Sequence, residues 1–244
     1  MSQVAVLTRT ESKLFLRDRT TLFFVFVLPI GLLSIFSLIS TGDGSDPAQH
    51  IPASFLPTMA IGIGVGILGT GGLSMVLATY RERGILRRLS TTPVKPHKLL
   101  TAQLVVHLAA AVVVVALILG VGTAAFGAKL PHNAAGFALA VLLYCCATFS
   151  MGLLLSAVLP NSKAVTIVGN IIFFPLMFFA GVWTPGDLMP ESIRFLRDIT
   201  PMGAGMTAMQ DAWAGGWPSG VNVAALIALS IVCLGLAVRY FRWE

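Results

Sequence analysis

Long apolar stretches alternate with short polar segments along the 244 residues of the chain. The stretches reach the roughly 20 residues that a helix needs to cross a lipid bilayer, so they do not suit a barrel of short alternating strands. The pattern predicts an all-α integral membrane protein, with residues 1–244 forming a single transmembrane domain. Six transmembrane helices are expected, at approximately 20–40, 55–79, 100–126, 134–159, 164–183 and 221–239.

Composition points to the same class. Hydrophobic residues make up 56% of the chain and charged residues only 11%, with a mean hydropathy of +0.88, whereas soluble domains carry about 25% charged residues. The net charge of +6 does not indicate a nucleic-acid partner, because 13 of the 16 Lys and Arg residues fall in segments that the pattern places on one side. An excess of Lys and Arg marks the cytoplasmic side, so we expect both termini to face the cytoplasm.

The most basic segment is residues 80–99, between the second and third apolar stretches, which holds six of the 16 Lys and Arg residues. Within it, residues 85–92 alternate at helical spacing and predict a short amphipathic helix. The helix is bounded by Gly84 and Pro93, its apolar side is Ile85, Leu86 and Leu89, and its polar side is Arg87, Arg88 and Ser90. Two interpretations stay open: a helix resting on lipid headgroups, or a docking helix for a soluble partner.

Residues 3–19 also predict an amphipathic helix, lying in the inner membrane interface ahead of the first span. Its apolar residues are Val4, Leu7, Leu14 and Phe15, and its polar residues are Arg9, Glu11, Lys13, Arg17, Asp18 and Arg19. Further on, Pro29 predicts a kink in the first span.

The segment between the fifth and sixth apolar stretches predicts two short helices. One begins at Pro190 and ends near Ile199, before Pro201. The next, over residues 202–214, carries an apolar stripe of Met202, Met206, Met209 and Trp213. It is too short to span a bilayer and too apolar to be left in water, which favours a re-entrant or interfacial hairpin on the outer side over a partly disordered loop.

The second apolar stretch is rich in glycine, and residues 64–69 match the dinucleotide pattern GxGxxG. That pattern requires a preceding strand and a helix N-terminus facing water, neither of which a membrane segment offers. Gly62 and Gly66 instead have the spacing of small residues that lets helix backbones approach one another. Helix packing is therefore the favoured interpretation.

Residues suited to catalysis are scarce. The sequence contains no GxxxxGK[ST] or HExxH motif, and all ten Asp and Glu residues lie outside the six expected spans. His107, one turn from Gln103, is the one candidate for an ion relay, but a neutral histidine bonded to a neighbouring helix is the preferred interpretation. Cys145, Cys146 and Cys233 lie within apolar stretches as packing residues, so we expect no metal site and no cofactor bound by this chain.

Three blocks of sequence resemble the permease subunits of type-2 ABC exporters, the ABC-2 group that includes daunorubicin and multidrug exporters. They are residues 17–19 leading into a first span with Pro29, residues 81–93, and residues 174–190 with Thr200 and Pro201. In the second block Glu82, Gly84, Leu86, Leu89 and Pro93 match the family's pattern, whereas Ile85 stands for a usual threonine, and Arg87 and Arg88 are additional arginines.

The resemblance implies that residues 3–19 form an elbow helix and that residues 80–99 carry a coupling helix for a separate ATP-binding subunit. The coupling residues would be Glu82, Gly84, Leu86, Arg87, Arg88, Leu89 and Pro93. Two such subunits, carrying ATP and magnesium, would join two permease chains, identical or similar, in a bacterial plasma membrane. The chain by itself is then not an enzyme.

The nature of the cargo is an expectation from the spans themselves. Few polar side chains lie in them, which favours a hydrophobic drug, an antibiotic or a lipid-like molecule. Candidate residues of the substrate path are Asn170, Phe173, Phe174, Met177 and Phe178, since the fifth stretch is broken by glycine and proline. Export of a lipid-linked polysaccharide and a scaffold or immunity role without transport are the alternatives.

Overall fold

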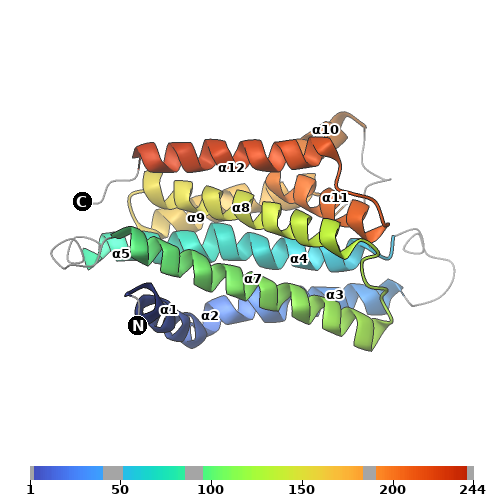
Figure 1. Cartoon of the computed structure of the whole chain (residues 1–244), viewed down its shortest axis with the longest axis horizontal. Coiled ribbons are helices and arrows are strands. Elements are labelled where there is room, and N and C mark those ends of the chain that lie inside the picture. Colours follow the sequence, from blue (N-terminus) through green and yellow to red (C-terminus); the bar gives the residue numbers. More distant parts are fainter. Residues whose placement is uncertain (1–2, 41–51, 86–95, 184–190, 241–244) are drawn as a thin grey trace.

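The computed structural model describes residues 3–40, 52–85, 96–183 and 191–240, and the regular structure in these ranges is helical. The helices run along a common long direction, apart from α1 and the short α10 (Figure 1). Their bounds are α1 Gln3–Arg17, α2 Arg19–Leu22, α3 Leu28–Ser40, α4 Phe55–Ile67, α5 Ser74–Glu82, α7 Pro96–Phe126, α8 Ala134–Val158, α9 Ser162–Phe179, α10 Glu191–Ile199, α11 Pro201–Trp213 and α12 Gly220–Tyr240. Two π-helical segments, η1 Phe23–Val27 and η3 Leu68–Leu73, join α2 to α3 and α4 to α5.

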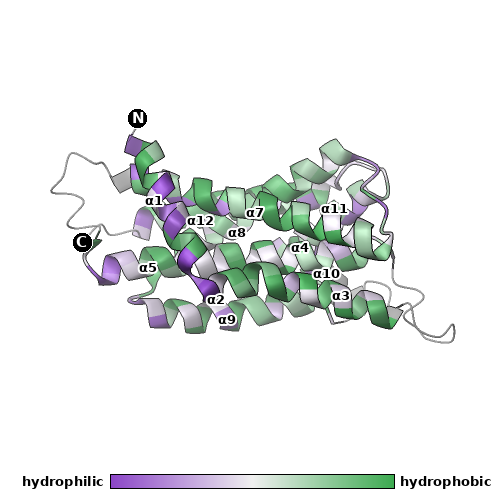
Figure 2. Ribbon diagram, turned by 90° about the horizontal axis from the view of Figure 1, so that it is seen from below, coloured by the Kyte–Doolittle hydropathy of each residue, from purple (hydrophilic) through white to green (hydrophobic). Residues whose placement is uncertain are grey.

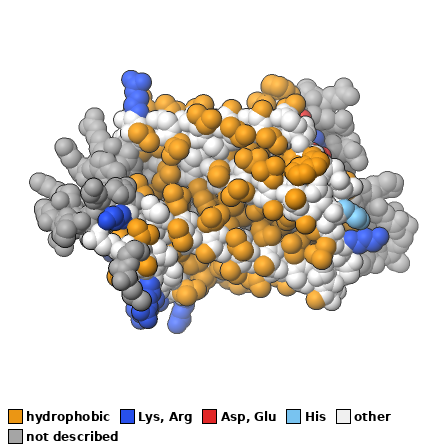
Figure 3. Space-filling view, in the orientation of Figure 1, with side chains coloured by type: hydrophobic (Ala, Val, Ile, Leu, Met, Phe, Trp, Pro, Cys, Tyr) orange, Lys and Arg blue, Asp and Glu red, His pale blue; other side chains and the backbone are white. Residues whose placement is uncertain are grey.

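Six helical runs in the described ranges are long and apolar enough to cross a membrane. They are Arg19–Ile39, Phe55–Glu82, Lys98–Phe126, Ala134–Val158, Ser162–Phe179 and Gly220–Tyr240. Each overlaps one predicted span, with ends that differ by at most four residues. Apolar residues cover the length of the bundle and hydrophilic residues gather near its ends (Figures 2 and 3). The expected all-α fold with six candidate spans is thus confirmed.

The second span, formed by α4, η3 and α5, is the central helix of the bundle. In the most apolar 18-residue stretch of this span 72% is buried inside the protein, whereas the corresponding share is 17% in α9 and in α12. Side chains have little room around such a helix, and its glycines make close contacts possible. A Cβ on Gly69 would lie 2.7 Å from the backbone of Thr148, and one on Gly152 of α8 would collide with the Gly69 carbonyl. Here η3 and α8 pack backbone against backbone.

The GxGxxG residues are packing residues, as expected from their place in an apolar stretch. Gly64 faces Val114, and Gly66 faces the ring of Phe173. The expectation that Gly62 and Gly66 mark the close backbone approach is wrong, since Gly62 faces the side chain of Met206 at 3.2 Å. The closest approach is one turn further on, because η3 brings Gly69 against α8.

The first span changes its helical form just before its proline. Pro29 has no backbone N–H and its ring crowds the carbonyl of residue i−4, which is Val25. Val25 lies in the middle of η1, where a wider helical turn separates the crowded groups. On the neighbouring span, Gly64 leaves room for the Val25 carbonyl and the Pro29 ring, at 3.3 and 3.4 Å from its ideal Cβ position.

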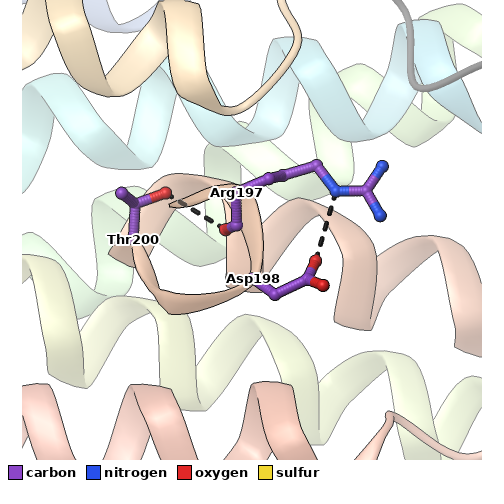
Figure 4. A network of polar contacts seen from close by, with 3 residues as sticks. All are labelled: Arg197, Asp198 and Thr200. Carbon is purple, nitrogen blue, oxygen red and sulfur yellow. Dashed lines mark hydrogen bonds and ion pairs between the residues drawn. The ribbon is translucent and has the colours of Figure 1, made fainter. Parts of the chain in front are cut away.

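The two short helices between the fifth and sixth spans are α10 and α11, close to the predicted ranges. At their junction the Thr200 hydroxyl donates to the Arg197 carbonyl at 3.1 Å, and the Arg197 guanidinium pairs with Asp198 at 3.2 Å (Figure 4). The stripe of α11 is fully packed: Met202, Met206, Met209 and Trp213 are at most 5% exposed. Since α11 contacts α4, α8, α9 and α12, it is part of the bundle and not a surface loop.

We predict that Gly152→Ala lowers the stability of the chain by about 1–3 kcal/mol, because a methyl group at this position must displace the backbone of η3. The matched control is Gly120→Ala in α7, which has no atom within 4 Å of its ideal Cβ position and should gain up to about 1 kcal/mol from helix propensity. Unfolding of the purified chain in mixed detergent measures both. Equal effects of the two substitutions would contradict the backbone contact.

Candidate functional site

The polar contacts that join separate helices are concentrated at the end of the bundle where α1, the end of α5, the start of α7 and the α8–α9 turn meet (Figure 1). We call this the α1 end. Its centre is the last turn of α5, where Tyr80, Arg81 and Glu82 each bind a different element. We call these three residues the α5 junction. The sequence places them directly before the basic loop of residues 83–95.

Arg81 binds the carboxyl end of α8. Its guanidinium donates to the Ser156 carbonyl at 2.8 Å, to the Ala157 carbonyl at 3.2 Å and to the Leu159 carbonyl. The last carbonyls of a helix have no partner within that helix and carry its partial negative charge. A planar guanidinium supplies several N–H donors to these carbonyls and places a positive charge beside them, which a lysine would do less completely.

Glu82 binds the amino end of α9, on the other side of the same turn. Its carboxylate accepts from the Ser162 backbone N–H at 3.1 Å and from the Ser162 hydroxyl at 2.8 Å. A negative charge at a helix N-terminus is favourable for the same electrostatic reason. Asn161 completes this end, since its side chain accepts from the Ala164 N–H at 2.8 Å. Neighbouring residues of opposite charge thus hold both sides of the α8–α9 turn.

The structure therefore gives Glu82, predicted as a coupling residue, a bond within its own chain, although its side chain is exposed. Gly84 ends the helix with a φ of +65°, a left-handed conformation that suits glycine. The other predicted coupling residues, Leu86, Arg87, Arg88, Leu89 and Pro93, lie outside the described residues. The roles of Arg81 and Ser162 were missed, because their contacts join residues more than 70 positions apart.

Tyr80 is the third member of the α5 junction and binds α1. Its hydroxyl donates to Glu11 at 2.7 Å, and Gln103 of α7 donates to the same carboxylate oxygen at 2.6 Å. Glu11 is only 7% exposed, and burial raises the pKa of this carboxyl, against the hydrogen bonds from Tyr80 and Gln103, which lower it. Lys98 of α7 adds a second hydrogen bond to α1 by donating to the Gln3 side chain at 2.7 Å.

These contacts correct the expected polar side of the N-terminal helix, which included Glu11. The helix lies along α7, and Glu11 faces the protein together with Phe15, whose ring meets His107. The spacing contained a signal, because Glu11 follows Val4 and Leu7 at helical intervals on the apolar stripe. A carboxylate within an apolar stripe indicates a buried partner.

His107 is buried near the same end. Its Nδ1 donates to the Gln103 carbonyl at 2.9 Å, so its bond goes to its own helix and not to a neighbouring one as expected. In the described ranges, no three His, Cys, Asp or Glu side chains are grouped closely enough to hold a metal ion.

The predicted path residues divide into two sets on α9. Asn170, Phe174 and Phe178 follow one another at intervals of four residues and share one exposed face, with Ile167 and Ile171 beside them. Phe173 and Met177 instead turn inward, Phe173 against Gly66 and Met177 to 7% exposure. The structure thus brings three of the five candidates to one surface.

The fold and this site define the class: a multi-pass membrane protein whose second span ends in a polar junction with α1, α8 and α9. A model of the family described as ABC-2 type transporter matches residues 2–213. The chain belongs to this family.

Two curated relatives agree with this assignment. A protein of Escherichia coli K12 named "Probable multidrug ABC transporter permease YbhS" is 28% identical over 195 residues, which are 78% of this chain and 50% of that protein. The chain thus spans about half the length of that relative. The "Daunorubicin resistance ABC transporter permease protein DrrB1" of Streptomyces coeruleorubidus is 23% identical over 224 residues, covering 89% of this chain and 78% of that protein.

We predict that docking of α1 weakens as the pH rises. Because burial raises the pKa of Glu11 in the docked state, the carboxyl binds its proton more tightly there, so docking is strongest below the ordinary value of 4.5 and weakens as the pH rises above it. The mobility of a spin label at the exposed Val6 should increase over this range. Glu11→Gln should abolish this dependence of mobility on pH. The same pH dependence in this variant as in the unaltered chain would contradict the role of Glu11.

Proposed function

We propose that the chain is the membrane-spanning permease subunit of an ATP-driven exporter in a bacterial plasma membrane. It would move a hydrophobic drug, an antibiotic or a lipid-like molecule outward, with ATP and magnesium bound by a separate subunit present in two copies. A second permease chain, identical or similar, would complete the assembly. Family membership and the six candidate spans support this function, and the names of the two relatives support a drug as cargo.

The observation that carries the proposal is the α5 junction. The loop expected to dock on the ATP-binding subunit begins directly after Glu82, and Glu82 is bonded to the first turn of α9. A force on the loop would therefore reach α9 without passing through lipid. Pro175 lies within α9, and a proline inside a helix permits bending, because one backbone hydrogen bond is missing.

The exposed face of α9 supports an amphipathic apolar cargo. Phe174 and Phe178 are 60% and 46% exposed in the single chain, and Asn170 contributes an amide to the same face. An amide left in hydrocarbon without a partner is costly, which favours a face covered by cargo or by the second permease chain. Phe173 and Met177 would support this face from behind.

Topology is tested by single cysteines in a background without Cys145, Cys146 and Cys233. We expect cysteines at Ser90 and Lys163 to react with an impermeant thiol reagent from the cytoplasm, and cysteines at Gly186 and Lys129 to react from outside. Lys163 and Lys129 are exposed residues at opposite ends of the bundle. Reaction of all four from one side would contradict the six-span arrangement.

Coupling is tested in the complex reconstituted with its ATP-binding subunit. Leu89→Asp should release that subunit, because a charge in a protein cleft is desolvated without a partner, at a cost of a few kcal/mol. Glu82→Ala should leave the complex intact and lower the cargo exported per ATP.

The controls test whether Glu82 acts through its bond to Ser162 inside the chain. Ser162→Ala removes the hydroxyl partner of Glu82 inside the chain and should reproduce part of the uncoupling, whereas Lys163→Ala, an exposed change on the same turn, should not. Wild-type assembly and export in Leu89→Asp and Glu82→Ala, with loss only when Arg87 and Arg88 are neutralised, would show that the loop rests on lipid headgroups.

A further inference from the structure

The side of α1 that was expected to lie in lipid packs against the protein instead. Val4, Leu7 and Phe15 belong to the predicted apolar side, and all three are partly buried, with α1 lying along α7. A helix at a membrane interface is normally held there by its apolar side. Since the protein covers that side, a different side of α1 faces outward.

The outward side of α1 carries three basic residues, which we call the basic row. Arg9, Lys13 and Arg17 follow one another at intervals of four residues, and all three are exposed. Four residues correspond to about 6 Å along a helix, so the row extends over about 12 Å. Among the described residues the one ion pair joins Arg197 to Asp198, so no acidic side chain there is paired with the basic row.

Aliphatic side chains lie beside the basic row. Val6 and Leu16 are 51% and 66% exposed, and helical spacing places both on the same side of α1 as Lys13. Figure 2 shows hydrophilic and hydrophobic residues mixed along this helix. A side that faced only water would leave the aliphatic groups uncovered. Basic and aliphatic groups next to one another suit the headgroup region of a bilayer, where phosphates and the first acyl carbons are both within reach.

The place of α1 in the chain puts the basic row at this level of the membrane. Asp18 alone separates α1 from the first candidate span, Arg19–Ile39. The Asp18 carboxylate accepts from the Thr20 and Thr21 N–H groups, both at 3.1 Å, at the start of that span. The end of α1 is thereby fixed to the membrane boundary, and the helix departs from the common direction of the spans (Figure 1).

We propose that the basic row is a binding site for the phosphate groups of anionic phospholipids in the leaflet at the α1 end. Lys and Arg residues near a membrane surface attract such lipids. The other side of α1 holds Glu11, which binds Tyr80 of the α5 junction and Gln103 of α7. A bound lipid therefore holds α1 against the α5 junction, so the charge of the membrane acts on the segment directly before the basic loop.

Binding is tested with two lipids that differ in charge, anionic phosphatidylglycerol and zwitterionic phosphatidylcholine, each carrying a nitroxide near its headgroup. Either labelled lipid is added in equal amount to phosphatidylcholine vesicles that contain the chain. A bimane fluorophore on a cysteine at the exposed Thr10, in a background without the three native cysteines, reports quenching at α1. Labelled phosphatidylglycerol should quench more strongly. Lys13→Gln should lower its association relative to phosphatidylcholine about fivefold, the effect of one charge.

Lys163→Gln is the matched control, because it removes one exposed charge at the same end of the bundle but not from α1. It should leave the preference at Thr10 unchanged. Equal quenching by the two lipids in the unaltered chain, or equal losses in Lys13→Gln and Lys163→Gln, would overturn the proposal. So would an acidic surface of the ATP-binding subunit as the occupant, which would abolish quenching by phosphatidylglycerol on assembly and release the subunit in Lys13→Gln.

Amide hydrogen exchange of residues 3–17 tests the effect of the lipid on docking. Exchange reports local opening, so it should be slower in vesicles that contain phosphatidylglycerol than in phosphatidylcholine alone. Lys13→Gln should reduce this difference about fivefold. Identical exchange in both vesicles would refute the hold of the lipid on α1. Both measurements use the chain without cargo or ATP, so a negative result leaves the proposed export function standing.

Discussion

The backbone contact between η3 and α8 sets the geometry of the bundle. Gly69 and Gly152 have no side chains, so the second span comes closer to α8 than any pair of larger residues would allow. Helices in a membrane gain little from excluding water, and close van der Waals packing is a main source of their association. The buried second span is the result, and its own glycines are needed for this packing.

The α5 junction depends on that contact. With the second span held against α8, its last turn lies within reach of the α8–α9 turn and of α1. Three consecutive side chains then serve three partners, since successive residues of a helix point in directions about 100° apart. Helix ends offer unpaired carbonyl and N–H groups, and these supply most of the binding partners of Arg81 and Glu82. A short segment thereby connects the basic loop to two spans.

The two polar clusters near α1 differ in kind. Around Glu11 a buried carboxyl group has two donors, which offset only part of the cost of burying its charge. Around His107 an acceptor is buried with no donor among the described groups. The hydrogen bonds of Glu11 connect α1 to α5 and α7, whereas a buried acceptor without a donor lowers the stability of the fold. Gln103 joins the two, since its side chain binds Glu11 and its carbonyl binds His107.

The class, the six spans and the short helices around them could all be predicted from the sequence, because span length, apolar periodicity and proline positions are local properties. Residues 81–93 and the other two blocks also carried the family resemblance. The packing of the helices was needed to show that Gly69 and not Gly66 makes the backbone contact, and that Phe173 and Met177 turn away from the exposed face of α9. The same packing shows that Glu11 is buried and that Glu82 binds Ser162. Each of these depends on which elements lie side by side. For Glu11 the helical spacing placed the residue on the apolar stripe, but it could not name Tyr80 and Gln103 as partners, because contacts between residues far apart in the chain are not encoded in local spacing.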